Sequence, residues 1–481
     1  MVVTNCATGT LAPYVPSAQA PWNRARIRHL YRRLGYGPTL AELEAGLSAS
    51  PGQLIDQLID QAIALPLTPE PEWSDWSIEQ YTDFQTQIGD QILGYTDLIV
   101  ESMITHGLRD KMTLFWLNHF VTKLEAYACP SWMYQYHRVL QSNALGNFRT
   151  MTEAVGTTPA MLVFLNGVQN NRFQPNENYA RELFELFTLG RDNGYTQEDI
   201  VNAARALTGW NGFSSLCAPI TFVPLLHDPG PKTVFGQTGN FNYEQLHNVL
   251  FTQRNVEISE YVCGRLYQFF VHEEINEDIV AGMAQTFRNN NFELAPVLRQ
   301  LFKSEHFFDE FVMGVQIKSP FDYFLAFFRE NNLDYNSETL RLVFYVATQL
   351  GQQLFNPPDV SGWPENRAWV DTSTLTGRWQ GSDYMLYTFY EQQPARLTAL
   401  AQTLSNNANT PEAVTAAIVD HFVAGGLLTP EAYSQATDVF KWMIPQNYYD
   451  DGSWNLNWET VPAQVALLLQ HISRLPEFQL M

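Results

Sequence analysis

The amino-acid sequence predicts a mostly α-helical fold: a single large helical domain with two long irregular excursions rich in Gly, Pro and Trp. Three observations predict it. Apolar residues recur at helical spacing over long stretches, helix-starting and helix-stopping residues flank these stretches, and few segments alternate as strands do. A chain of 481 residues is long enough to bury a large core.

We expect an extended tail at residues 1–22, rich in Ala, Pro, Ser and Thr, and a single helical domain over residues 23–481. In the first half of this domain, the helical segments begin or end at Gly or Pro and carry Leu, Ile or aromatic residues at helical spacing. These segments are 24–37, 39–47, 51–65 and 87–127, the last with a break near Gly107.

The stretch 175–210, PNENYARELFELFTLGRDNGYTQEDIVNAARALTGW, predicts two further helices. Thr196, with an acid three residues later, predicts a capping box at the start of the second. In the first, apolar residues cover more than half of the circumference, and Arg181, Glu182 and Glu185 share the narrow remaining stripe. We expect this helix to be buried on most sides. Because buried charges must be paired or bound to something, the stripe is a candidate site.

Two regions break the helical pattern. Residues 211–243 are rich in Gly, Pro and Asn, with a short hairpin expected around Gly236 to Gly239. Residues 354–380 hold several Pro, Gly and Trp residues. Long irregular segments inside compact domains are usually either functional or wrongly assigned as irregular. Helices are expected to resume from about residue 383 to the C-terminus.

Composition limits the partners. The chain has 28 Lys+Arg against 50 Asp+Glu, a formal net charge of -22, which argues against nonspecific binding to nucleic acid. A basic substrate or bound cations would suit this charge better, although a plain acidic surface explains it equally. P-loop, dinucleotide-binding and G-x-S-x-G motifs are absent from the sequence, which argues against kinases, Rossmann dehydrogenases and typical α/β-hydrolases.

Four scattered cysteines, Cys6, Cys129, Cys217 and Cys263, form no C-x-x-C pair, which excludes a zinc ribbon or a thioredoxin-type motif. Their even number permits disulfides without predicting a framework.

No window is long and apolar enough for a membrane span, and the N-terminus lacks the pattern of a signal peptide. As written, the chain is therefore expected to be soluble and cytoplasmic.

The spacing of Arg181, Glu182 and Glu185 supports two interpretations. Arg181 and Glu185 lie four residues apart and can form a salt bridge along a helix. Glu182 and Glu185 can instead converge, which raises one pKa as a general acid requires, or places both on a divalent metal ion. The structural alternative is a buried ion-pair network with Arg205 as a further partner.

Histidines extend this candidate site. His119 shares a helix face with aromatic residues and is either a metal ligand or a core histidine bonded to backbone. His227, Asp228 and Lys232 lie in the loop HDPGPK, where Asp228 could orient His227 and Lys232 could stabilise an anion. The alternative is a turn in which Asp228 caps local backbone N–H groups.

The second excursion carries tryptophans beside charged residues: Asp359, Trp363, Arg367, Trp369 and Asp371. Aromatic faces next to carboxylates suit sugar rings, and pairs of acids carry most glycoside hydrolysis. A structural loop pinned by prolines and buried tryptophans explains the same composition.

Six segments, in matching order, resemble the bacterial family known as domain of unknown function 1800. They are 29–43, 110–122, 175–190, 195–210, 227–239 and 356–375. The resemblance implies a largely helical bacterial protein, often exported, whose biochemical function is not established. Relatives often carry His at the position of Leu117, so this chain argues against a site built on two adjacent histidines.

These observations favour an enzyme with a buried carboxylate and histidine site, acting by metal-assisted hydrolysis on a glycan or another ring-containing small molecule. In this hypothesis His119, His227, Glu182 and Glu185 hold a divalent metal ion. The catalytic groups are Glu182, Glu185, Arg181, His227, Asp228 and Lys232. The alternative is a non-catalytic helical binding or assembly protein in which the same charges are structural. The sequence does not predict an oligomeric state.

Overall fold

The computed structural model of the protein describes residues 8–212, 215–442 and 444–481. The chain is 61% helical, and the described residues contain 23 α-helices and one small two-stranded sheet. The predicted mostly α-helical fold is confirmed. Within the same residues, no helix is both long enough and apolar enough to cross a lipid bilayer.

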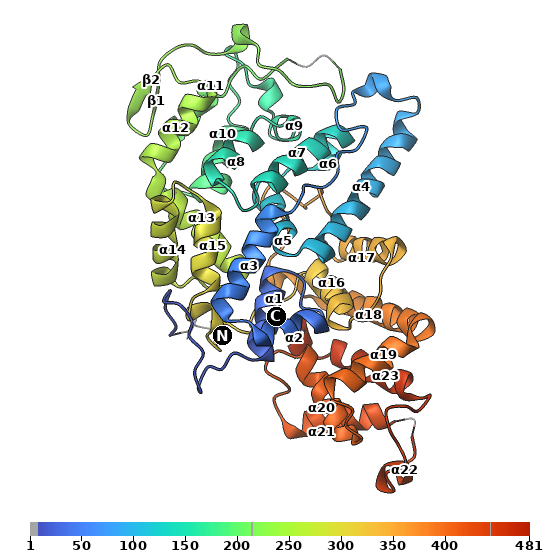
Figure 1. The fold of residues 1–481 in the computed structure, drawn as a ribbon. Helices are drawn as coiled ribbons and strands as arrows, with labels where there is room; N and C mark the ends of the chain where they lie inside the picture. Colours follow the sequence, from blue (N-terminus) through green and yellow to red (C-terminus); the bar gives the residue numbers. More distant parts are fainter. Residues whose placement is uncertain (1–7, 213–214, 443) are drawn as a thin grey trace.

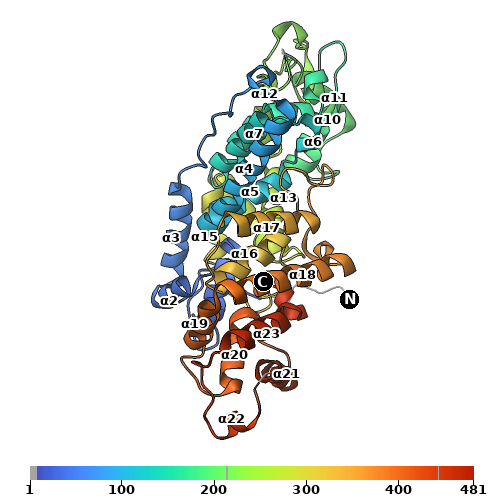
Figure 2. The same ribbon diagram turned by 90° about the vertical axis from the view of Figure 1, so that its right-hand side faces the viewer.

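The molecule is elongated, and its helices form three groups along its length (Figure 1; Figure 2). The middle group consists of α1 (Arg24–Leu34), α2 (Leu40–Ser48), α3 (Pro51–Ala64), α5 (Leu108–His119), α13 (Asn255–Phe270), α14 (Glu277–Asn289), α15 (Leu294–Phe302), α16 (Pro320–Glu330) and α17 (Ser337–Gln349). Helix α4 (Phe84–His106) runs from this group into the upper one.

The upper group consists of α6 (Leu124–Tyr127), α7 (Pro130–Asn143), α8 (Phe148–Val155), α9 (Pro159–Phe164), α10 (Asn178–Glu182), α11 (Gln197–Ala206) and α12 (Tyr243–Gln253), with strands β1 (Lys232–Val234) and β2 (Gln237–Gly239). The lower group consists of α18 (Thr372–Gln392), α19 (Pro394–Leu404), α20 (Pro411–Phe422), α21 (Pro430–Lys441), α22 (Asn447–Asp450) and α23 (Val461–Ser473). One continuous cluster of buried apolar side chains, from Leu30 to Phe478, runs through all three groups.

Local sequence signals set several helix boundaries. Gly107 adopts φ +60° and separates α4 from α5, which confirms the expected break because this conformation favours glycine. Thr196 and Asp199 form the expected capping box of α11. The described part of the N-terminal segment is irregular, and it is held to the end of α15 by a backbone hydrogen bond of 2.7 Å from Tyr14 to Lys303.

The first excursion contains the expected hairpin. Strands β1 and β2 pair antiparallel, with Val234 opposite Gln237. The two residues between them, Phe235 and Gly236, both have positive φ angles, which is the geometry of a tight two-residue hairpin turn.

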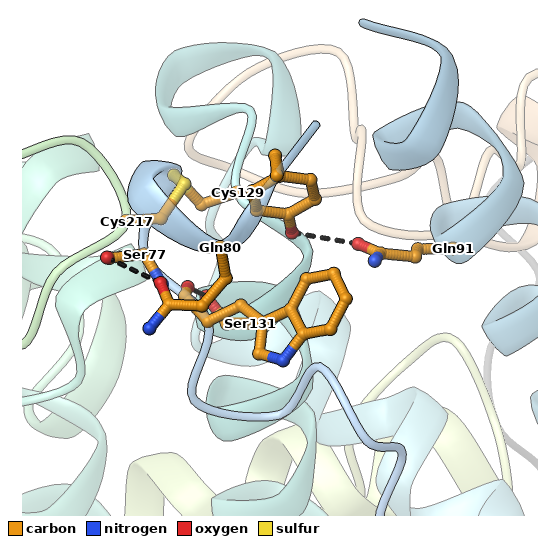
Figure 3. Close-up of a disulfide and its surroundings, with 8 residues drawn as sticks. Ser77, Gln80, Gln91, Cys129, Ser131 and Cys217 are labelled. Atoms are coloured by element: carbon orange, nitrogen blue, oxygen red, sulfur yellow. Dashed lines mark hydrogen bonds between the residues drawn. A yellow bond between two sulfur atoms is a disulfide. The ribbon is translucent and has the colours of Figure 1, made fainter. Parts of the chain in front are cut away.

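A disulfide joins this excursion to the helical body. Cys217 bonds to Cys129, which precedes α7, across a sequence separation of 88 residues (Figure 3). Close to the bridge, the Ile78 amide donates to the Leu216 carbonyl at 2.9 Å, and the Ser131 hydroxyl donates to the Trp76 carbonyl at 2.8 Å. Three distant segments therefore meet at one covalent link, whose pairing the cysteine spacing did not predict.

The second excursion is shorter than predicted. Helix α18 begins at Thr372, so residues 372–380 are helical and not irregular. The cause is Asp371, whose carboxylate accepts hydrogen bonds from the Ser373 and Thr374 amides and starts the helix. Upstream, the segment forms one short helical turn, Asn366–Trp369.

Candidate functional site

The helix that carries the acidic stripe changes its hydrogen-bonding pattern in the middle. Helix α10 ends at Glu182, and residues Leu183–Thr188 continue as a π-helix. Its wider turn is marked by the Leu189 amide, which donates to the Phe184 carbonyl five residues earlier at 2.8 Å. Such turns are rare and occur often at functional sites. The apolar periodicity predicted an ordinary α-helix here, so the π-helix is a correction.

Side chains from two other helices bond the carbonyls of this π-helix. The His119 Nε2 lies 2.9 Å from the Phe187 carbonyl oxygen, and the Tyr261 hydroxyl donates to the Leu186 carbonyl at 2.9 Å. Burial lowers the pKa of His119 to about 3, so the ring is neutral at neutral pH and donates its Nε2 hydrogen to Phe187. This geometry supports the interpretation of His119 as a core histidine bonded to backbone.

The predicted salt bridge between Arg181 and Glu185 is wrong. Arg181 pairs instead with Glu177 at 3.0 Å, and Glu185 pairs with the exposed Arg191 at 2.8 Å. The π-helix explains the difference, because its wider turn no longer places residues four apart directly above one another.

Glu182 is the acid of this stripe without a direct partner. Within the described ranges it has no hydrogen bond and no ion pair, and its side chain is half-buried. Burial, and then the neighbouring Glu185, raise the pKa of Glu182 above its ordinary value. The charge of Glu185 thus raises the pKa of Glu182, as the spacing of the two acids predicted.

The HDPGPK loop is held by contacts of its own. The His227 Nδ1 lies 3.0 Å from the Thr208 carbonyl, so Asp228 does not orient this ring. Asp228 pairs with Arg205 at 2.7 Å and also accepts from the Gly230 amide at 2.8 Å. Arg205 therefore binds the loop. The expectation that it would be a further partner of the glutamates in a buried ion-pair network is wrong.

Lys232 is also committed to this loop. Its ammonium group is buried and donates to the carbonyls of Asp228 and Gly230 at 2.5 and 2.9 Å. Burial lowers its pKa. In the part of the chain that the structure describes, no group of three or more His, Cys, Asp or Glu side chains is placed to hold a metal ion. The four expected ligands, His119, His227, Glu182 and Glu185, are thus not brought together as a metal site.

A cavity of about 290 Å³ lies beneath the second excursion. Trp363 and Trp369, which are 4% and 6% exposed, line it. Its walls come from elements that are far apart in the sequence: α5, α13, the segment before α16 and the residues after α17. The polar lining residues are Asn118, Gln268, Glu273, Gln316, Ser319, Asp322, Gln352, Glu365 and Asn366.

The carboxylates of this cavity are neutralised by cations. Glu365 pairs with Arg265 at 2.5 Å, and Glu273 pairs with Arg367 at 3.0 Å. At the buried end, Asp322 accepts hydrogen bonds from Lys111 and from the Ser319 hydroxyl, the latter at 2.8 Å.

The sequence-predicted charged residues of the excursion also have partners, either a charged side chain or backbone amides. Arg367 forms one of these pairs, whereas Asp359 accepts from the Ser361 amide at 2.7 Å and Asp371 caps α18. The carboxylates of the lining thus carry little uncompensated charge.

One face of α13 connects this cavity with the acidic stripe. Tyr261, Arg265 and Phe269 follow one another at four-residue spacing, so they share a face of the helix. Tyr261 bonds the π-helix, Arg265 holds Glu365, and Phe269 lines the cavity. Glu185 and Glu365 both help to raise the pKa of Tyr261, after its burial, which indicates that the two acidic regions lie near this face.

Comparison with known proteins identifies the family. The sequence profile of the family described as Protein of unknown function (DUF1800) matches residues 29–480, nearly the whole chain. The chain belongs to this family. No curated protein and no solved structure matches it.

In this DUF1800 chain, two of the six segments that carry the family resemblance meet at the cavity. Asn118 comes from the segment 110–122 and accepts at its amide oxygen from the Trp363 amide at 2.5 Å, in the segment 356–375. Gly362 packs so closely on Asn118 that a side chain there would collide with it. Sequence reasoning missed Asn118, Gln268 and Gln352, because single amides on separate elements carry no recognisable spacing.

Proposed function

We propose that this protein binds a small, uncharged, ring-containing polar molecule, such as a sugar unit, in the cavity beneath Trp363 and Trp369. The observation that carries the proposal is the combination of two buried indoles with polar groups that have unused hydrogen-bonding capacity. Ligand sites are typically apolar or aromatic, with a few polar groups that fix orientation. The cavity volume is close to the lower end of the range for such sites, roughly 300 Å³, which suits one ring or two.

Three polar groups of the lining lack a protein partner among the described residues. Gln352 accepts from the Phe321 amide at 3.0 Å, but its own NH₂ group donates no hydrogen bond. Gln268 donates to the Glu273 carbonyl at 3.1 Å, while its amide oxygen accepts none. The indole N–H of Trp369 is also without an acceptor. Two donors and one acceptor around a cavity are the complement of a hydroxyl-bearing ligand.

The charge pattern supports an uncharged ligand and a binding function. Glu365, Glu273 and Asp322 each have a cation at hydrogen-bond distance, so a charged ligand would find no free counter-charge there. Glycoside hydrolysis requires one protonated and one ionised acid across the bond that is cleaved. Each of these acids is bound to a cation, so none is left free to act as one of a catalytic pair, which favours binding over catalysis in this cavity.

Catalysis at Glu182 is the second candidate function. A half-buried carboxyl with a raised pKa beside a second acid is the arrangement that general acid chemistry uses. The metal-assisted version of this hypothesis has no supporting ligand cluster among the described residues.

We also propose that the protein works in an oxidising compartment. The Cys129–Cys217 disulfide supports this location, because disulfides persist in exported proteins and are rare in reducing cytosol. Mass spectrometry of protein isolated from its native cells without reductant should recover the two cysteine peptides as one linked species. Recovery of both thiols in reduced form would contradict the proposal.

Binding is tested by screening an array of mono- and oligosaccharides with the wild-type protein and with Trp369→Phe. The variant keeps an aromatic ring but loses the free indole N–H, so we expect its affinity for any sugar found to fall by roughly three- to tenfold. Trp442→Phe is the matched control, because Trp442 is 75% exposed and lies far along the chain from the cavity. Equal affinities of wild type and Trp369→Phe, or no bound sugar at all, would contradict the proposal.

A further inference from the structure

Helix α1 buries four arginines in a chain whose net charge is -22. Buried charges are expected to be paired, because leaving them alone in a low dielectric is costly. Three of the four have an ion pair or donate to neutral oxygens, and Arg26 does both, with Glu310 at 3.5 Å and the Pro21 carbonyl at 3.1 Å. Arg32 makes a double contact with the buried Glu330, at 2.5 and 2.8 Å, and Arg33 donates to Gln316 and to two backbone carbonyls.

Arg28 is the exception. The residue is 6% exposed, yet it forms no hydrogen bond and no ion pair with any described residue. Glu330 and Asp420 attract it only over a longer distance, and Arg32 and Arg24 repel it. Burial, followed by the repulsion from Arg32, lowers the pKa of Arg28 to about 10. The guanidinium therefore remains positively charged at neutral pH and has unused donors.

Arg28 lies between two cavities at the start of α1. One, of about 320 Å³, is lined by Arg26, Arg28, His29 and Arg32. The other, of about 580 Å³, lies beside it and shares Arg28. In the first cavity, the acidic lining residue is Glu310, whose side chain is 77% exposed and contacts Arg26 loosely at 3.5 Å. The other cavity contains Asp420.

A further donor in the first cavity is also unused. Among the described residues, the buried Arg26 Nε–H has no hydrogen-bond partner. Asn23 and Ala25, at the N-terminus of α1, line both cavities. The N-terminus of a helix carries partial positive charge. A positive wall with free donors in an otherwise acidic protein is complementary to an anion.

We propose that Arg28, flanked by Arg26 and Arg32, binds an oxyanion, the phosphate or carboxylate group of a small molecule, at the start of α1. The planar guanidinium offers two parallel donors, which match both groups. This site is next to the cavity beneath Trp363 and Trp369, because Met481 lines both, but its polar groups are different, so it neither requires nor excludes a sugar there.

The test is calorimetric titration of the wild-type protein with inorganic phosphate and, separately, with succinate, at constant ionic strength maintained with NaCl. We expect saturable binding of at least one of the two, and the one that binds identifies the group. Arg28→Gln should weaken it by about tenfold or more. Arg191→Gln, at an exposed arginine that lines neither cavity, should leave the affinity unchanged.

Thermal unfolding without ligand separates binding from a structural role. If Arg28 serves binding, Arg28→Gln should melt at the same temperature as the wild type or higher, because an uncompensated buried charge has been removed. Arg28→Lys keeps the charge but loses the two parallel donors of the guanidinium. It should therefore fold normally and bind the anion more weakly than the wild type. Absence of saturable binding of both probes, or equal binding by wild type and both variants, would overturn the proposal. A lower melting temperature of Arg28→Gln, with its affinity unchanged, would overturn it as well.

Discussion

At the scale of single residues, the unusual feature is that acids and bases which look alike in the sequence differ in their partners. Glu185 and Asp228 are tied to arginines, whereas Glu182 has a raised pKa and no direct partner within the described ranges. Arg32 and Arg28 differ in the same way on one helix. The groups without partners are therefore the candidates for function, because a structural charge is expected to be compensated.

The Glu182→Gln variant tests this distinction. A carboxyl whose pKa is higher in the folded than in the unfolded state destabilises the fold once pH exceeds both pKa values. We expect the variant to raise the free energy of unfolding at pH 8 by less than about 1 kcal/mol, since solvent screens a half-exposed group. At pH 4 the difference should vanish.

Urea unfolding at the two pH values measures this difference. Glu185→Gln is the matched control, and it should be slightly less stable than wild type because it loses the contact with Arg191. A marked loss of stability in Glu182→Gln at pH 8 would show that the acid is structural.

At the scale of elements, irregular segments position the candidate sites, and each is fixed by a specific contact. The π-helix is held by His119 and Tyr261, the second excursion by the contact between Asn118 and Trp363, and the first excursion by the disulfide. Regular helices supply the frame, and these contacts determine where the side chains of the excursions lie.

The disulfide should be the strongest of these contacts. Replacing Cys129 and Cys217 together by Ala removes a link that closes a loop of 88 residues, so we expect the free energy of unfolding to fall by about 2–4 kcal/mol. Guanidinium unfolding of wild type and the double variant, both without reductant, measures the change. Cys263→Ala is the control for a buried cysteine outside the bridge. Unchanged stability of the double variant would mean that the excursion is held by its other contacts.

Sequence patterns predicted the elements better than the sites. The capping box at Thr196, the break at Gly107 and the hairpin near Gly236 are local events, each determined by a few neighbouring residues. The π-helix was missed because an insertion of one residue per turn hardly alters the apolar pattern between Leu183 and Thr188. The cavity was missed for a different reason: its amides come from separate helices that only packing brings together.

At the scale of the whole molecule, the core buries several histidines in their neutral form. Burial lowers the pKa of His119 to about 3 and the pKa values of His137 and His421 to about 4. The unfolded chain binds protons at these histidines below about pH 6.5 and the native protein does not. Stability is therefore fully present above that pH and is lost as the pH falls toward 4.

We expect the free energy of unfolding to decrease by up to about 1.4 kcal/mol per pH unit for each of these histidines between pH 6 and pH 4.5. His119→Gln can still donate to the Phe187 carbonyl but does not titrate. The slope of its free energy of unfolding against pH should therefore be smaller than that of the wild type by the contribution of one proton. Urea unfolding across this range gives both slopes. Parallel curves for wild type and variant would show that His119 is protonated in the folded protein.

The central claim is that the cavity beneath Trp363 and Trp369 receives an uncharged polar ring, and Gln352 tests it most directly. Gln352→Glu keeps the oxygen that accepts from the Phe321 amide but removes the free NH₂ donor. The measurement is the affinity of wild type and variant, by calorimetry, for the sugar that the array selects. The account predicts a loss of about tenfold or more in the variant. Equal affinity would contradict it, because the ligand would then bind without touching this cavity.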